Sequence, residues 1–137
     1  MRRTASCHHV CSSQCTRSIP TSSYTISTVK RPVWPFCASR RNRGHPCSVS
    51  AVTEHELYSY PHLTPSEVAR IDALFTTLTV IDVDSRIAQL SGQLRASYGI
   101  KALDSFIAAT ALMTGTTLAT RNVRDFRRIP NLDIREL

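Results

Sequence analysis

The second part of this 137-residue sequence, from about residue 48 onward, predicts a three-layer α/β domain. Short β-branched runs alternate there with longer segments of helical periodicity, and this alternation favours parallel strands joined by right-handed crossovers. Turn and capping residues also stand at the points where the periodicity changes. We therefore expect one domain with a parallel sheet between two helical layers.

The first predicted elements lie between residues 48 and 75. Residues 48–52 have the composition of a short strand, and the helix that follows must end before Pro61. The sequence Thr-Pro-Ser-Glu at 64–67 is a capping box with proline at the first helical position. The apolar stripe of the helix that it starts consists of Val68, Ile71, Leu74 and Phe75.

The next elements repeat the change from strand to helix. Residues 78–83 are a β-branched run of strand length, and Asp84 caps a helix that Gly99 ends. We expect Asp104 to begin another helix, which ends at Gly115. That helix is apolar nearly all round, so we expect it to be buried on most sides.

Three short segments complete the pattern. We expect residues 116–120 to form a strand and residues 122–126 to form a turn or short helix. Residues 132–137 have the pattern of a last strand. In parallel sheets, sites form beyond the carboxyl ends of the strands. This rule predicts that polar side chains after several strands converge on one edge: Glu56, Asp104, Asn122 and Asp125.

The first part of the chain has a different composition. Residues 1–53 carry eight basic side chains and no acid, whereas residues 54–137 carry nine basic and all ten acidic side chains. All five cysteines lie within residues 1–47, together with much serine, arginine and proline. We expect residues 1–47 to be a basic, irregular leader and residues 48–137 to be the folded domain.

Several interpretations of this leader remain open. A zinc site would use thiols and imidazoles, but the ligand spacing differs from the usual two close pairs: Cys7, His8, His9, Cys11 and Cys15. An organellar targeting peptide and a disordered arm that contacts phosphates are two alternatives. The simplest interpretation is a frame-shifted or wrongly started translation. The chain has no apolar run of the roughly 18 residues that a membrane helix needs, so we expect no membrane partner.

Three motifs of the second part resemble a known family. Residues 50–57, 103–112 and 118–126 look like the later motifs of PIN-domain ribonucleases, and specifically of VapC-type toxins of toxin–antitoxin pairs. The resemblance implies a PIN-like fold and a cytoplasmic endoribonuclease that depends on Mg²⁺ or Mn²⁺. It also implies an RNA substrate, a small antitoxin partner and a homodimer within the complex.

The resemblance also assigns roles to individual residues. Glu56 and Asp104 correspond to metal-binding carboxylates, and Asn122 or Asp125 to the fourth polar position of the site. Each residue has an alternative interpretation. Glu56 competes with Glu54, since positions two apart on a helix point to opposite sides, and the family spacing favours Glu56 and leaves Glu54 as a solvated surface charge. Asp104 would more often be a helix cap and Asn122 a turn residue, while Asp125 would form a surface ion pair with one of the arginines Arg121 and Arg128.

One part of the family pattern is missing. The family opens with an apolar strand that ends in an aspartate and lies in the middle of the sheet, whereas the first acid of this chain is Glu54. We therefore expect an incomplete PIN-like domain whose catalysis is impaired. The alternative is a non-catalytic PIN remnant that only binds an antitoxin-like partner.

Overall fold

The computed structural model describes residues 9–12 and 47–136, which form strands and helices around one sheet. The zinc, targeting and phosphate-binding hypotheses for the leader concern residues that mostly lie outside these ranges. The elements follow one another along the chain in this order: β1 (His9–Ser12), β2 (Cys47–Ser50), α2 (Ala51–Tyr58), α3 (Pro65–Phe75), β3 (Thr79–Ile81), α4 (Ser85–Tyr98), α5 (Ala102–Thr114), β4 (Thr116–Thr120), α6 (Val123–Phe126) and β5 (Ile134–Glu136).

The strands form a five-stranded mixed sheet in the order β3-β2-β1-β4-β5. The predicted parallel pairing is confirmed between β2 and β3 and between β4 and β5. The central strand β1 runs antiparallel to both neighbours, with Val10 opposite Ser48 on one side and Leu118 on the other. Since β2 and β4 both oppose β1, they run in the same direction as each other.

Strand β1 lies within the segment that the sequence predicts to be an irregular leader. Its four residues occupy the middle of the sheet, where the family places its opening strand. The physical reason is that β2 and β4 would otherwise each present a row of backbone donors and acceptors without partners. The segment His-Val-Cys-Ser contains no carboxylate, so β1 supplies a strand without the expected aspartate.

The helix ends follow the predicted capping chemistry. Thr64 and Glu67 make the reciprocal capping box that begins α3, and the Asp84 carboxylate accepts a hydrogen bond from the Ile87 amide at the start of α4. Helices α4 and α5 end at Gly99 and Gly115, which have φ values of 62° and 61°. These left-handed conformations are costly for residues with a Cβ, which explains glycine at both positions.

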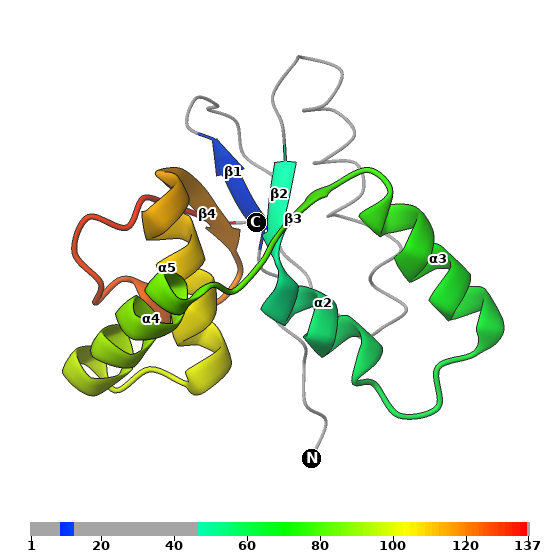
Figure 1. Cartoon of the computed structure of the whole chain (residues 1–137), viewed down its shortest axis with the longest axis horizontal. Helices are drawn as coiled ribbons and strands as arrows, with labels where there is room; N and C mark the ends of the chain where they lie inside the picture. Colours follow the sequence, from blue (N-terminus) through cyan, green and yellow to red (C-terminus); the bar gives the residue numbers. More distant parts are fainter. Residues whose placement is uncertain (1–8, 13–46, 137) are drawn as a thin grey trace.

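Helices cover both faces of the sheet, and each face has its own apolar core. Figure 1 shows α4 and α5 together on one side, with α3 on the opposite side. Leu118 of β4 packs with the α4–α5 core, whereas its neighbour Ala119 packs with Val49 in the α2–α3 core. Alternate residues of one strand therefore point into different cores, as a three-layer arrangement requires.

No helix in the described part of the chain combines the length and the apolar character needed to cross a membrane.

Candidate functional site

The topology brings the carboxyl ends of four strands, β2, β3, β4 and β5, to the same end of the sheet, here called the strand-end edge. Strands β2 and β4 share a direction through their common partner β1, and β3 and β5 run parallel to them. Helix α2 leaves this edge directly after Ser50, and the turn before α6 leaves it directly after Thr120. Only Gly115 separates α5 from β4, so the N-terminal end of α5 lies toward the same edge.

Asp104 lies in the first turn of α5 and is only 6% exposed. The expectation that Asp104 begins this helix was wrong, because the helix starts at Ala102 with Lys101 as its N-cap residue. The Lys101 side chain makes no capping hydrogen bond. Asp104 is thus a buried carboxylate near the positive end of a helix dipole, where negative charge is favoured. Its burial is unlike that of a routine surface cap.

Glu56 lies in the second turn of α2, where it is half-buried and its Oε2 atom is shielded from solvent. Thr53 precedes it by three residues and therefore lies on the same side of the helix. The Thr53 hydroxyl is buried and has no hydrogen-bond partner within the described residues. An unpaired buried hydroxyl is costly, and such groups commonly mark a bound water or ion. Glu54 lies instead toward Tyr58, one turn along the helix.

Asn122 and Asp125 are joined directly. The Asn122 side-chain amide donates a 2.8 Å hydrogen bond to Asp125 Oδ2, and the Asn122 backbone amide donates to Thr120 Oγ1 at 3.1 Å. Asn122 is the N-cap residue of α6, but its side chain makes no capping bond. The Asn122 side-chain amide therefore holds Asp125 in place, and its hydrogen bond occupies one oxygen of the Asp125 carboxylate.

Two buried hydroxyl groups tie α5 to this edge of the sheet. A 3.2 Å hydrogen bond joins the hydroxyls of Thr110 in α5 and Ser50 at the end of β2. Both side chains are completely buried. Sequence reasoning did not single out these positions or Thr53 as site residues. Ser50 carries a detectable signal as a serine before a helix, whereas Thr110 looks like part of an apolar helix.

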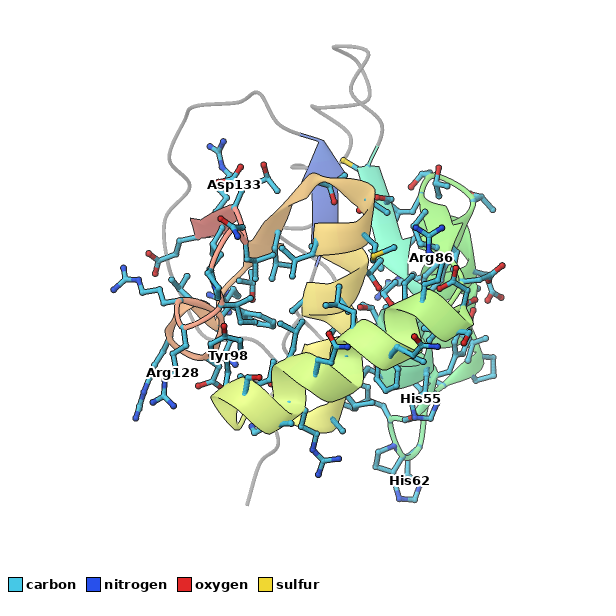
Figure 2. The ribbon with its side chains drawn as sticks, turned by 60° about the vertical axis from the view of Figure 1, so that its left-hand side comes forward. His55, His62, Arg86, Tyr98, Arg128 and Asp133 are labelled. Atoms are coloured by element: carbon cyan, nitrogen blue, oxygen red, sulfur yellow. The ribbon has the colours of Figure 1, made fainter. Side chains whose placement is uncertain are left out.

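Tyr58, at the end of α2, has a raised pKa. Its hydroxyl donates a short hydrogen bond to Asp72 on α3, and its ring stacks on Phe75 with centroids 6.1 Å apart. This hydrogen bond, desolvation and the charges of Asp72 and Glu54 together raise the pKa of Tyr58 to about 12. Figure 2 shows His55 and His62 close to each other and well away from Arg128 and Asp133.

The oxygen donors at this edge suit a hard divalent cation. Within the residues that the structure describes, no three or more His, Cys, Asp or Glu side chains gather into a metal-binding group. Mg²⁺, however, is commonly held by one or two carboxylates, with waters and substrate phosphates completing its octahedron. The buried carboxylate of Asp104, the shielded oxygen of Glu56 and the unpaired hydroxyl of Thr53 fit such a sparse site.

Comparison with known sequences gives a consistent result. The family model described as PIN domain matches residues 37–132. Ribonuclease VapC19 of Mycobacterium tuberculosis is 33% identical over 96 residues, which cover 66% of this chain and 75% of that protein. The tRNA(fMet)-specific endonuclease VapC of Salmonella typhimurium is 31% identical over 96 residues, covering 64% and 73%.

Solved structures show the same similarity. The DNA-bound VapBC of Salmonella typhimurium aligns with a TM-score of 0.67 and 27% identity, over 81% of this chain and 90% of that chain. VapBC2 of Rickettsia felis, bound to a promoter DNA fragment, aligns with a TM-score of 0.60 and 26% identity, over 66% and 74%.

Proposed function

This chain belongs to the PIN-domain family, and from that premise we propose that it is the toxin of a VapC-type toxin–antitoxin pair, an endoribonuclease that cleaves RNA with Mg²⁺ or Mn²⁺. The expected resemblance to VapC ribonucleases is confirmed by the family match and by the curated relatives. The observation that carries the catalytic proposal is the buried Asp104 carboxylate at the strand-end edge.

Each candidate residue has a separate task in this proposal. Asp104 and Glu56 provide carboxylate oxygens for the cation, which when bound would polarise the scissile phosphate and activate a water molecule. Asn122 holds Asp125 in a fixed orientation, so that its second carboxylate oxygen can bind water or substrate. Thr53 contributes a hydroxyl that accepts or donates one hydrogen bond inside the site.

We further propose that a small antitoxin binds this chain, that the complex contains two copies of it, and that the pair acts in the cytoplasm. Both structural relatives described above are VapBC complexes, which supports the antitoxin partner.

The second candidate function is a non-catalytic remnant that keeps only the antitoxin-binding surface. It is favoured by β1, which fills the middle of the sheet without a carboxylate. Residues 1–53 contain no Asp or Glu, so this stretch offers no carboxylate in place of the missing ligand. Each lost carboxylate weakens cation binding.

One cleavage assay separates the two functions. Four proteins are incubated with the same labelled RNA and Mg²⁺: the chain as it stands, Asp104→Asn, Asp133→Asn, and a version with residues 1–47 replaced by a PIN-type opening strand and helix. Asp133 is an exposed carboxylate that precedes β5, at the opposite edge of the sheet, so it controls for loss of charge.

The enzyme hypothesis predicts chelator-sensitive cleavage that Asp104→Asn lowers on the order of 100-fold and Asp133→Asn leaves unchanged. The remnant hypothesis predicts that only the version with the replaced opening cleaves. If the unmodified chain cleaves the RNA and Asp104→Asn cleaves it equally fast, Asp104 is rejected as a metal ligand. Circular dichroism melts of all four proteins exclude misfolding as the cause.

A further inference from the structure

A cluster of arginines follows β4 immediately beside the candidate site. Residues 121–128 contain four arginines and a single acid, Asp125. Three of these arginines are exposed, and the side chain of none of the three has a hydrogen bond or ion pair within the described part of the protein: Arg124, Arg127 and Arg128, here called the arginine patch. The Asp125–Arg128 ion pair considered from sequence is therefore not formed there.

The backbone beneath the arginine patch is firmly held. Phe126 is completely buried and Ile129 is 4% exposed, so apolar anchors lie between and beside the arginines. The Arg127 amide donates to the Val123 carbonyl at 2.9 Å, which continues the helical path past α6. Residues spaced i, i+3 and i+4 on such a path share one side, and the arginines have this spacing.

Three neighbouring guanidinium groups repel one another when no anion lies between them. A rigid backbone that keeps them together, with no side-chain partner among the described residues, is therefore typical of a surface that binds a polyanion. Guanidinium groups donate two parallel hydrogen bonds to a phosphate, which makes arginine well suited to a nucleic-acid backbone. The patch also shares its segment with Asn122 and Asp125, whose side chains belong to the candidate site.

We propose that the arginine patch binds the phosphates of single-stranded RNA and so holds the strand across the Asn122–Asp125 end of the candidate site. This inference rests on the proposed function, since it supplies the substrate contact of that same site. The arginines are binding residues in this proposal, and none of them takes part in the chemical step. An acidic protein segment is the competing occupant.

The test compares two triple variants of the full chain with equal loss of charge. The patch variant is Arg124→Gln, Arg127→Gln and Arg128→Gln. The control variant is Arg70→Gln, Arg86→Gln and Arg95→Gln, on α3 and α4, where the three arginines are likewise exposed and unpaired among the described residues. Figure 2 shows Arg86 and Arg128 on opposite sides of the molecule, with Arg128 pointing away from the ribbon.

Binding is measured without cleavage, in chelator, by fluorescence anisotropy with a labelled single-stranded RNA of about 12 nucleotides. The patch variant should bind at least about tenfold more weakly near 0.1 M salt, and its log–log salt slope should fall by about 2, since each phosphate contact contributes about 0.7. The control variant should keep both values. In Mg²⁺, the patch variant should raise KM with little change in kcat.

The outcomes separate this inference from the proposed function. Loss of RNA binding confined to the patch variant supports the inference even if the chain cleaves no RNA. Normal binding by the patch variant, or equal losses in both triple variants, overturns it even if the chain is an active ribonuclease. The competing occupant is tested with a polyglutamate peptide of matched charge. If this peptide displaces the labelled RNA as effectively as unlabelled RNA does, and if the patch variant loses peptide binding to the same extent, the surface binds an acidic protein and the RNA proposal is overturned.

Discussion

The two faces of the sheet are packed in different ways. On the α4–α5 face, Ile107, Ala108 and Ala109 are completely buried, and buried hydroxyl pairs join α5 to both α4 and β2. On the α2–α3 face, α3 buries only Ile71 and Leu74, and its other contacts lie near the surface. We conclude that α5 is a rigid support for Asp104, whereas α3 is an outer layer that can open without disturbing α5.

Hydrogen exchange tests this conclusion directly. Amides of α5 should exchange only through global unfolding, while those of α3 should exchange through a smaller local opening. Equal protection of α3 and α5 would show that both faces of the sheet open together and that α3 is not a separate, less stable layer.

The largest effect is expected on the α4–α5 face. Ile107→Ala removes a side chain with no exposed surface, so the surrounding helices cannot easily close the cavity. We expect it to lower the free energy of unfolding by about 4 kcal/mol. Met113→Ala, at a 38% exposed position of the same helix, should change it by less than about 0.5 kcal/mol. Urea denaturation measures both variants.

A smaller effect is expected from Ile71→Ala on α3. Ile71 is 3% exposed, but α3 is a single outer helix that can shift toward the sheet and close part of the cavity. We expect a loss of about 2 kcal/mol in the free energy of unfolding. Faster hydrogen exchange should be confined to α2 and α3. If exchange in α5 accelerates equally, the two faces are more tightly coupled than their packing indicates.

The capping box of α3 should contribute less again. In Thr64→Ala, the Glu67 amide loses the side-chain oxygen that accepts its hydrogen bond. We expect a loss of about 1 kcal/mol in stability, measured by thermal melting, and a larger fractional effect on local exchange in α3. Thr64→Ser keeps an accepting hydroxyl and should behave like the unmodified chain.

The smallest effect concerns the pH dependence of the α2–α3 contact. The pKa of Tyr58 is raised to about 12, above its unfolded value of 10.0, so the native state holds this proton more tightly. The resulting stability is present below pH 10 and lost as the pH rises from 10 to 12. Because Tyr58 is 40% exposed, solvent screening limits the effect to a few tenths of a kcal/mol.

Both Tyr58→Phe and Asp72→Asn should therefore flatten the pH dependence of unfolding between pH 10 and 12. A steep decline that persists unchanged in both variants would assign the alkaline transition to other groups. Urea titrations at several alkaline pH values provide the measurement.

Local chemistry explains which elements the sequence could predict. The Thr64 capping box, the Asp84 cap and the glycines at 99 and 115 act through neighbouring residues, and all four lie where the sequence placed them. The sequence predicted the helix that contains Asp104 but placed its start two residues too late, at Asp104 instead of Ala102. Lys101, the actual N-cap residue, is not a typical capping residue and gives no signal for the start.

Strand β1 and the site contacts depend on distant parts of the chain. The segment His-Val-Cys-Ser has no distinctive periodicity, and it becomes a strand only because two remote strands leave a space between them. The Asn122–Asp125 hydrogen bond and the lack of a partner for the Thr53 hydroxyl among the described residues depend on how side chains are oriented in the folded protein. The periodicity of apolar residues along the sequence carries no information about these orientations. The convergence of Glu56, Asp104 and Asn122 remains a prediction, supported by the shared strand-end edge.

The position of β1 also has a consequence for the order in which the protein is made. Val10 pairs with Leu118, more than 100 residues further along the chain, so β1 leaves the ribosome long before one of its two partners exists. During that interval the sheet can contain β1 with β2 and β3, but its centre stays open on the β4 side. A nascent chain with such an open edge is a substrate for chaperones and for pairing with other chains. The last stage of synthesis, when β4 and β5 emerge, therefore decides whether the sheet closes on itself.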